Sequence, residues 1–516
     1  MTTDLMASQL AQPFGSFTGI LRDWSRVQPD ALALVDESRE VYWAELIGEV
    51  ERLAARLVET GLKRGQSVAI LGKSSVNYAL AFLAAVRAGG VAAPLTTSAS
   101  PEQLEGMAND SGARHLFIDA GKAAELGPDF MADLIRVPLE EIDQWMAPPG
   151  STTPDFEPEP GDPFNIIYSS GTTGIPKGIV HSHQMRWRQF GATALSYLEA
   201  GLPVRSLAST PLYSNTTMVA FLAPLLAGGT IRVMGKFDCA RWLEHAQADR
   251  TTVTMLVPVQ YQRLMDFPAF DEFDLSALAM KYCTSAPFSA ELKREVLGRM
   301  PGGLIEIYSM TEGGVVCLLA AHEFPDKLHT VGRPAPGSEV KVLDDEDNEV
   351  SPGTPGNLIG RSQTMMSGYK NRPDKTAEAQ WTDPNGEVWM RMGDIGRVDE
   401  EGFVELVGRA KDMIISGGFN IYPSDLEAEL EREDDVVEAA VVGIASRQWG
   451  ETPVGFVVLS ADARSADEVM AAVNARLGKT QRLSALHPID EMPRSHIGKL
   501  LKTDLREEAV RRGIAG

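Results

Sequence analysis

Helical and strand-like patterns of apolar and polar residues alternate in the first part of the chain. Helical patterns cover 43–60 and 78–88, and short apolar runs typical of buried strands cover 67–71 and 90–95. Strands that alternate with helices usually pair in parallel, with the helices packed on the faces of the sheet. This region is therefore predicted to form parallel sheets covered by helices.

The same alternation returns after residue 200. Strand-like runs cover 207–211, 230–234 and 252–257, and a helical pattern covers 218–227. The chain has 516 residues, which is more than one hydrophobic core usually supports. We therefore expect an α/β protein with at least two domains.

The pattern of apolar and polar residues changes beyond Glu339. Short β-like runs separated by turn formers predict a small β-rich subdomain there. From Lys411 onward, strands at 439–442 and 454–459 and a helix at 466–477 predict a compact α+β unit. The C-terminal part is thus expected to fold separately from the parallel sheets.

Composition and charge exclude several classes of function. The net charge of −23 and the pI near 4.8 argue against binding to nucleic-acid backbones or anionic membranes, because both attract basic patches. Cys239, Cys283 and Cys317 are too few and too scattered for a disulfide framework or a zinc site. The N-terminus lacks a leader pattern, and no stretch approaches ~18 uninterrupted apolar residues. We expect a cytoplasmic protein.

The segment 168–178 has the composition of a loop that binds phosphate. Gly171 and Gly174 let the backbone approach an anion, and Lys177 adds a positive charge. It is not the P-loop pattern, because Gly178 stands where that pattern requires Ser or Thr after the lysine. Taken alone, the segment equally fits a surface linker rich in turn formers. Its hydroxyl-bearing residues are Ser169, Ser170, Thr172 and Thr173.

Two further segments carry polar residues suited to a nucleotide. Thr311 and Glu312 follow a strand-like run and offer oxygen ligands to a magnesium ion bound to a nucleotide. Asp394, placed by neighbouring glycines, can accept two ribose hydroxyls, and Arg409 can join it on the sugar or phosphate side. Each feature taken alone is more often an ordinary surface residue or a loop.

Five ordered segments together resemble the adenylate-forming enzymes of the ANL superfamily, in particular its AMP-forming acyl- and aryl-CoA synthetases. The superfamily also includes peptide-synthetase adenylation domains and beetle luciferases. The segments are 168–178, 306–314, 392–396 with 407–412, 408–427, and 492–500. The last contains Pro493, four residues, Gly498 and Lys499, which matches the catalytic-lysine motif of the family.

The resemblance implies a fold and a domain boundary. It implies a large N-terminal AMP- and acyl-binding domain, residues 1–409, with parallel-rich sheets flanked by helices plus a β-rich subdomain. It also implies a small mobile α+β domain, residues 410–516, that carries Lys499 and turns about Lys411 as its hinge. Gly417 and Gly418 would line the tunnel of the pantetheine arm, where missing side chains let a thin ligand pass.

The resemblance also assigns roles to residues. Thr172, Glu312 and Lys499 are the implied catalytic residues, and Thr172 and Glu312 are the implied magnesium ligands. ATP, Mg²⁺ and CoA are the implied cofactors and co-substrates. Their implied binding residues are Ser169, Ser170, Gly171, Thr172, Thr173, Gly174, Lys177, Tyr308, Ser309, Thr311, Asp394, Arg409, Gly417, Gly418 and Lys499.

The chain departs from the family pattern at three places. Ser214 stands where most relatives have a histidine that gates the acyl pocket, and Ser309 replaces the usual glycine. The stretch 479–482 lacks the usual Lys-x-Pro turn. His181 and His183 are interpreted as structural. The residues expected to line the acyl pocket are Tyr213, Ser214, Asn215, Thr216, Ile307, Ser309, Gly314 and Val315.

The expected function is an acid–thiol ligase. It would use ATP to convert an aromatic, arylalkanoic or medium-chain carboxylic acid into an acyl-adenylate, and CoA would then take the acyl group. Three alternatives stay open: a stand-alone ligase that loads a carrier protein, a luciferase-type oxygenase, and a nucleotide-binding homologue that has lost catalysis. The expected partners are the acid, ATP and CoA, with no nucleic acid and no membrane span. A homodimer is left open.

Overall fold

The computed structural model describes residues 3–169, 176–416, 419–446, 449–478, 482–495 and 498–514. The chain divides into two compact units, each described below by itself. Unit one comprises residues 1–328, 335–338 and 361–390, and unit two comprises 329–334, 339–360 and 391–516. The domain boundary expected after Arg409 lies within unit two and stays a prediction.

The first sheet of unit one has seven strands in the order β18-β8-β7-β4-β3-β5-β6. Strands β3 to β6 pair in parallel, whereas β7 and β8 form an antiparallel pair. The strands expected at 67–71 and 90–95 are confirmed as β3 and β4. The strands are β3 (Ser67–Leu71), β4 (Val91–Pro94), β5 (His115–Ile118), β6 (Ile135–Pro138), β7 (Pro163–Ser169), β8 (Lys177–Ser182) and β18 (Gly368–Tyr369).

A second sheet runs through unit one in the order β14-β13-β12-β11-β9-β10-β1-β2. The strand expected at 207–211 was placed too late, because the chain turns at Pro211, whose carbonyl accepts from the Ser214 amide at 2.9 Å. The strands are β1 (Leu32–Val35), β2 (Glu40–Tyr42), β9 (Arg205–Ala208), β10 (Thr230–Val233), β11 (Val253–Leu256), β12 (Met280–Cys283), β13 (Gly303–Met310) and β14 (Gly313–Ala320).

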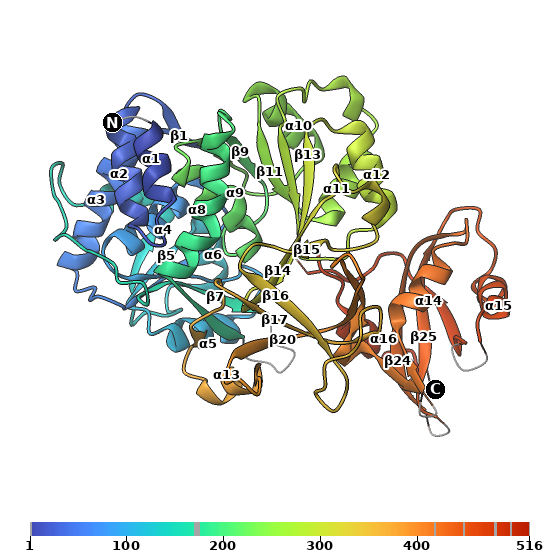
Figure 1. Ribbon diagram of the computed structural model, residues 1–516. Helices are drawn as coiled ribbons and strands as arrows, with labels where there is room; N and C mark the ends of the chain where they lie inside the picture. The colour runs from blue at the N-terminus through green and yellow to red at the C-terminus, as the bar shows by residue number, and fades with distance from the viewer. Residues whose placement is uncertain are drawn as a thin grey trace. The chain divides into compact units, whose positions relative to one another are not determined.

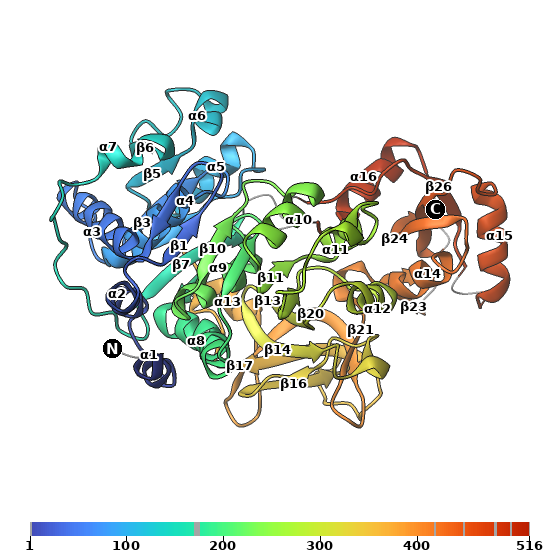
Figure 2. The same cartoon turned by 90° about the horizontal axis from the view of Figure 1, so that it is seen from above.

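Helices form the layer that joins the two sheets (Figures 1 and 2). Helix α8 (His183–Glu199) packs on β7 and β8, α9 (Met218–Leu226) packs on β9 to β11, and the two helices contact each other. Helix α4 (Val76–Arg87) begins before the expected residue 78, because the Ser75 hydroxyl caps it by accepting from the Tyr78 amide. All three helices are rich in apolar residues that the core buries.

Other helices of unit one pack against these three: α3 (Trp43–Glu59) contacts α4, β1 and β2, and α2 (Phe17–Val27) contacts α3, α4 and α9. Among the described residues, no helix is both long enough and apolar enough to cross a bilayer. The α-helices are α1 (Thr3–Leu10), α2 (Phe17–Val27), α3 (Trp43–Glu59), α5 (Pro101–Ser111), α6 (Ala120–Leu126), α7 (Ile142–Trp145), α10 (Cys239–Ala248), α11 (Pro258–Met265), α12 (Ala290–Arg299) and α13 (Pro373–Glu378). The short 3₁₀ turns are η1 (Leu139–Glu141), η2 (Asn215–Thr217), η3 (Phe270–Glu272) and η4 (Pro325–Lys327).

Unit two begins with β-rich segments, as the sequence predicted. Strands β16, β17 and β20 follow one another in a sheet, and β21 pairs with β20 in antiparallel fashion. Strand β20 contributes its first residues to unit one, where β19 (Gln380–Thr382) pairs with them. The strands are β15 (Arg333–Pro334), β16 (Ser338–Leu343), β17 (Gly356–Ser362), β20 (Val388–Val398) and β21 (Val404–Arg409).

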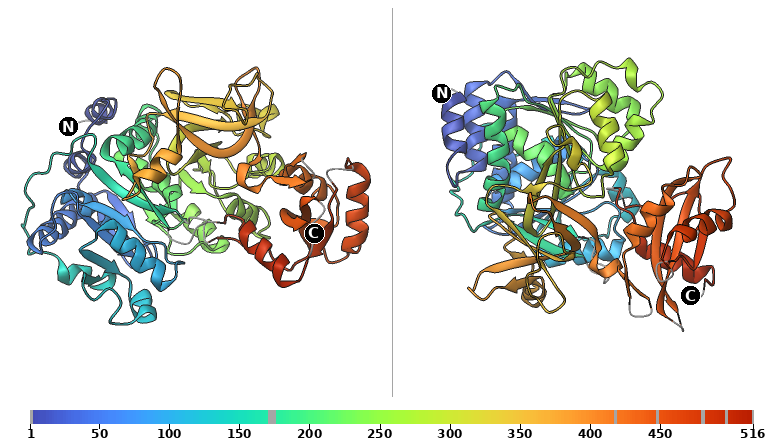
Figure 3. Two further views of the ribbon diagram at one scale, coloured as in Figure 1. Left: turned by 90° about the horizontal axis from the view of Figure 1, so that it is seen from below. Right: turned by 45° about the vertical axis from the view of Figure 1, so that its right-hand side comes forward.

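The C-terminal part of unit two is the expected α+β fold, orange to red in Figure 3. Its sheet has the order β23-β22-β25-β24, and β26 pairs in parallel with β25. Helices α14 and α15 bury their apolar residues in one cluster and α16 in another. The elements are η5 (Ala410–Asp412), β22 (Ile414–Ser416), β23 (Phe419–Ile421), α14 (Pro423–Leu430), β24 (Val436–Ser446), β25 (Gly450–Leu459), α15 (Ala466–Arg476), β26 (Ala485–Pro488) and α16 (Lys502–Arg511).

Candidate functional site

The strands on either side of the predicted phosphate loop are antiparallel neighbours, with Ser169 opposite Lys177. A P-loop instead leads from a strand into a helix, so this arrangement agrees with the departure seen in the sequence. The Lys177 ammonium lies over the Tyr369 ring, 5.0 Å from its centroid. The loop residues Ser170, Gly171, Thr172, Thr173 and Gly174 lie outside the described residues, as does the side chain of Ser169.

Thr311 and Glu312 form the tip of a hairpin between β13 and β14, so the predicted position at a strand end is confirmed. The next residue, Gly313, has a φ of +94°, and a Cβ there would lie 2.5 Å from the Thr364 carbonyl oxygen. The Glu312 carbonyl accepts from the Met366 amide at 2.8 Å. The hairpin tip is therefore seated closely on the segment 364–366.

The Glu312 carboxylate has a partner that sequence reasoning missed. The Tyr369 hydroxyl donates to Glu312 Oε1 at 2.8 Å, and burial together with the Glu312 charge raises the pKa of Tyr369. Tyr369 reaches this point because β18 pairs with β8, with Tyr369 opposite Ile179. Sequence spacing gave no signal, since the contact depends on sheet pairing.

A buried histidine and arginine lie behind the hairpin tip. Arg186 Nη2 donates to His181 Nδ1 at 2.8 Å, so the proton of the neutral imidazole resides on Nε2. His181 Nε2 therefore donates to the Thr311 carbonyl oxygen at 2.8 Å. Burial, and then the Arg186 charge, hold the pKa of His181 well below its ordinary value. The sequence assigned His181 only a structural part.

The predicted acyl-pocket residues 213–216 lead into the short turn η2 and form its first two residues. Ser214 and Thr216 are buried, and the Ser214 hydroxyl accepts from the Thr216 amide at 3.3 Å. Tyr213 is half-buried, and burial raises the pKa of its hydroxyl. The Thr216 hydroxyl pairs with that of Ser285 at 2.5 Å. Ser285, which the sequence did not single out, adopts a left-handed φ of +83°.

The remaining pocket candidates lie on the β13–β14 hairpin. Ile307 is half-buried, and its carbonyl accepts from the Thr284 hydroxyl at 2.7 Å. Val315 is fully buried, and Gly314 adopts a φ of +78°. Thr284 and Ser285 thus connect the hairpin to the turn at 213–216. Ser309 and Tyr308, both half-buried, continue β13 toward the tip.

In unit two, Asp394 and Arg409 are opposite residues of β20 and β21. Arg409 Nε lies 2.8 Å from Asp394 Oδ1, and Asp394 is only 7% exposed. Gly393, with a φ of +71°, bends the strand just before the carboxylate. The sheet register therefore pairs the two residues that the motif spacing proposed.

Lys499 lies on a tight turn of unit two. The Ser495 amide donates to the Lys499 carbonyl at 2.8 Å, and Gly498 allows the turn with a φ of +76°. The pKa of Lys499 lies below its ordinary value because of partial desolvation and then repulsion by Arg409 and Lys411. Asp394 and Asp412 oppose that shift, and the residue keeps an exposed surface that lets water screen these charges.

The predicted hinge, Lys411, lies in the short 3₁₀ turn η5. The neighbouring Asp412 forms an ion pair of 2.9 Å with Arg506 of α16. Strands β22 and β23 that follow are antiparallel, with Ser416 opposite Phe419. Gly417 and Gly418 lie outside the described residues, as do 479–481, so the predictions made for them stay predictions.

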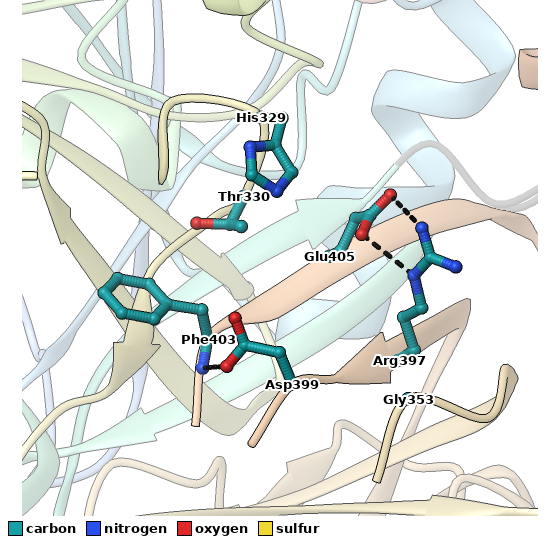
Figure 4. Close-up of a pocket in the computed structure, with 7 residues that line it drawn as sticks. All are labelled: His329, Thr330, Gly353, Arg397, Asp399, Phe403 and Glu405. Carbon is teal, nitrogen blue, oxygen red and sulfur yellow. Dashed lines mark hydrogen bonds and ion pairs between the residues drawn. The ribbon is translucent and has the colours of Figure 1, made fainter. Parts of the chain in front are cut away.

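Figure 4 shows a small cavity in unit two, of about 200 Å³. Arg397 on β20 and Glu405 on β21 form two hydrogen bonds of 2.8 Å, and Asp399 accepts from the Phe403 amide. The charged side chains around the cavity thus pair with one another or with backbone. The lining residues include none of the predicted site residues: His329, Thr330, Gly353, Arg397, Asp399, Phe403 and Glu405.

Within the described ranges, no three His, Cys, Asp or Glu side chains gather closely enough to hold a metal ion. A magnesium ion that arrives with a nucleotide needs few protein ligands, because phosphate and water oxygens supply most of its shell. The Glu312 carboxylate, held by Tyr369, is a donor of the required hard kind. The site therefore fits nucleotide-bound magnesium and does not resemble a resident metal centre.

Two parallel-rich sheets joined by helices, together with a C-terminal α+β part that carries Lys499, are typical of the adenylate-forming class of protein. The sequence model of the "AMP-binding enzyme" family matches residues 21–370, and that of the "AMP-binding enzyme C-terminal domain" matches 425–499. The chain belongs to this family of AMP-binding enzymes. The family and the fold class expected from the sequence are thereby confirmed.

Individual relatives match over nearly the whole chain. A feruloyl-CoA synthase of an Amycolatopsis species is 32% identical over 489 residues, covering 93% of this chain and 96% of the relative. The indoleacetate–CoA ligase of Aromatoleum aromaticum is 32% identical over 505 residues, covering 94% of this chain and 96% of the relative. The crystal structure of ATP-bound MatB from Rhodopseudomonas palustris matches with a TM-score of 0.81 at 27% identity, and the match covers 95% of this chain and 99% of MatB.

Proposed function

We propose that this chain is an AMP-forming acid–thiol ligase that joins a carboxylic acid to CoA at the expense of ATP. The observation that carries the proposal is the grouping of Lys499 with Asp394 and Arg409. These residues are far apart in the sequence, yet their charges act on one another within unit two. The matched family and the CoA-ligase relatives support the same chemistry.

In the first half-reaction, a carboxylate oxygen of the acid attacks the α-phosphorus of ATP. A new P–O bond forms, the bond to the β-phosphate oxygen breaks, and pyrophosphate leaves. Asp394 accepts hydrogen bonds from the ribose hydroxyls, and Arg409 assists on the sugar or phosphate side. The Lys499 ammonium bridges the attacking carboxylate and the α-phosphate, where charge develops in the transition state.

Magnesium, when bound with the nucleotide, would neutralise charge on the phosphate oxygens. Glu312 is its proposed protein ligand, with Thr172 as the second. The contact with Tyr369 supports this role, because a carboxylate already held by a hydrogen bond loses little freedom when it binds an ion. The Lys177 ammonium lies over the Tyr369 ring and so places a positive charge beside the tyrosine that holds Glu312.

In the second half-reaction, the CoA thiol attacks the acyl carbon of the adenylate. The thioester bond forms, the bond to the phosphate oxygen breaks, AMP leaves and the thiol proton passes to solvent. We propose that residues 410–516 turn about Lys411 between the two steps. This motion withdraws Lys499 and presents Gly417 and Gly418 to the pantetheine arm.

The proposed substrates are aromatic and arylalkanoic acids first, and medium-chain alkyl acids second. The acids in the names of the relatives, ferulate and indoleacetate, support this order. The buried hydroxyls of Ser214 and Thr216 give the predicted acyl pocket an uncharged lining. An uncharged wall is compatible with a bulky, neutral acyl group and offers no cation to a second carboxylate.

The protein is further proposed to be cytoplasmic, since its three cysteines are all free thiols. A homodimer also stays a proposal. The first experiment incubates the protein with ATP, Mg²⁺ and a panel of aromatic, arylalkanoic and alkyl acids, with and without CoA. Mass spectrometry then follows AMP, pyrophosphate and thioester.

AMP and thioester that appear together and only with CoA are the expected result. Pyrophosphate and bound adenylate without thioester would replace CoA by a carrier protein as the acceptor. Oxygen consumption linked to adenylate would favour the luciferase-type reaction. An absence of turnover with every acid, despite tight ATP binding, would overturn the ligase and favour the nucleotide-binding homologue.

A further inference from the structure

A buried guanidinium connects three segments of unit one that flank or carry predicted nucleotide-binding residues. Arg186 of α8 is fully buried. Its Nε donates to Asn165 Oδ1 at 2.8 Å, its Nη1 to Gln189 Oε1 at 2.7 Å and its Nη2 to His181 Nδ1 at 2.8 Å. The ring of Phe190 lies 5.5 Å from the guanidinium carbon.

The three groups that accept these hydrogen bonds from Arg186 are all neutral. Burial lowers the pKa of Arg186 to about 9, so the group still carries its charge at neutral pH. A buried charge without an opposite charge beside it is costly, and a core that needed only packing would be served by an apolar residue. Arg186 is therefore retained at a cost that a packing role does not explain.

The partners of Arg186 lie next to the predicted site in the chain. Asn165 is on β7, which ends at Ser169, and His181 is on β8, which begins at Lys177. His181 in turn donates to the Thr311 carbonyl, directly before Glu312 in the hairpin tip. One side chain of α8 thus connects both strands beside the predicted phosphate loop and, through His181, the carboxylate-bearing turn.

We propose that Arg186 and His181 are positioning residues for magnesium-bound ATP. Arg186 fixes His181 in the tautomer with its proton on Nε2, and His181 then holds the Thr311 carbonyl so that Glu312 meets the ion. The same bonds hold β7 and β8 in register beside the phosphate loop. This inference rests on the proposed function, because it assigns the ion and the nucleotide to that site.

The test compares three variants with a matched control. His181→Gln keeps an acceptor for Arg186 and a donor for Thr311, because its amide carries both groups on one carbon. His181→Leu removes both. The double variant His181→Leu/Arg186→Leu also removes the buried charge, so it leaves no poorly satisfied guanidinium in the core as His181→Leu alone would. His183→Gln is the control, since that buried histidine packs against the Phe164 ring.

Two measurements separate positioning from a merely structural role. Calorimetry gives the Kd of ATP in the presence of Mg²⁺ and in the presence of EDTA. ¹⁵N spectra of histidine-labelled protein report whether the imidazole proton of His181 resides on Nε2. Pyrophosphate exchange and thioester formation from supplied acyl-adenylate report the two half-reactions.

We expect His181→Leu and the double variant to weaken ATP binding with Mg²⁺ by about 10- to 100-fold, the range for residues that orient a metal ligand. Binding of ATP in EDTA should change much less, and thioester formation from supplied adenylate should stay near normal. His181→Gln should recover most of the lost affinity.

Equal weakening of ATP binding with and without Mg²⁺ would overturn the inference. Normal Mg²⁺-dependent ATP binding in a folded double variant would also overturn it. Failure of the proposed ligase function gives a different result from failure of this inference, because the wild-type protein would then bind ATP without turnover of any acid.

Discussion

The hairpin tip with Glu312 and the turn with Lys499 both carry charged residues proposed for catalysis, but they are built in opposite ways. Glu312 is held through its side chain by Tyr369 and through its backbone by Met366, and the preceding carbonyl by His181. Lys499 is held through its backbone by Ser495, and its side chain is surrounded by charges while it stays exposed.

The difference matches two kinds of chemical task. A carboxylate that receives the same ion in every cycle benefits from a fixed position, because reorganisation during binding is then small. A lysine that assists one half-reaction and is proposed to leave before the next benefits from a position defined only by a local turn. The comparison predicts sharply different responses to mutation in the two regions.

The largest effect is expected at the exposed lysine. Lys499→Ala removes a charge that we propose acts only in the transition state of adenylate formation, so pyrophosphate exchange should fall by about 10²- to 10³-fold. Thioester formation from supplied acyl-adenylate and CoA should stay near normal. Lys341→Ala, which alters an ion pair with Glu349 in the same unit, is the control. Equal loss of both half-reactions would contradict the proposed role.

The next largest effect tests whether the Lys499 region turns about Lys411. Lys411→Pro restricts the backbone of η5, so pyrophosphate exchange should stay near normal. Thioester formation should fall by at least about tenfold, because a small misplacement of reacting groups can cost up to ~100-fold in rate. Lys411→Ala keeps the backbone free and should behave like the wild type in both assays. Normal thioester turnover in the proline variant would refute the hinge.

A smaller effect is expected from loosening the fixed carboxylate. Tyr369→Phe removes the hydrogen bond to Glu312 and leaves the charge in place, so the Mg²⁺ concentration for half-maximal exchange should rise by about tenfold. Glu312→Gln, which removes the charge, should raise it further. A magnesium titration of Tyr369→Phe that overlays the wild type would show that the contact does not position the ligand.

The seating of the hairpin can be tested through stability. Gly313→Ala places a Cβ 2.5 Å from the Thr364 carbonyl oxygen at a φ of +94°, so it should lower the free energy of unfolding by about 1–3 kcal/mol. Gly402→Ala, at a φ of +85° with open space around the new Cβ, measures the backbone cost alone. Urea unfolding of both variants gives the difference, and equal losses would mean that the hairpin tip can shift.

The last effect depends on pH and concerns His183, the buried histidine two residues after His181. Burial lowers the pKa of His183 to about 4, below the ~6.5 of an unfolded chain. The unfolded state therefore binds the proton first, and the stability present above pH ~6.5 is lost as the pH falls toward ~4. Relative to His183→Phe, the wild type should lose about 2 kcal/mol between pH ~7 and ~5. Parallel urea-unfolding curves for the two proteins would contradict this burial effect.

Several elements could be predicted because their signals are local. The strand at 67–71 is a fully buried apolar run, and the helix at 466–477 begins at the capping residue Ser465. The strand expected at 439–442 proved much longer, as β24, because its outer residues alternate between faces and lack a continuous apolar run. Local patterns thus gave the element types and missed several ends.

The sequence alone determined the family, the order of the chemical segments and the identity of Glu312, Asp394, Arg409 and Lys499 as the residues to examine. Motif order along the chain carries that information directly. Only the tertiary structure placed Tyr369 on Glu312, His181 on Thr311, Arg186 between two strands and Asp394 opposite Arg409. Such contacts depend on sheet order and helix packing, which join residues far apart in the chain, and no local pattern of apolar and polar residues encodes them.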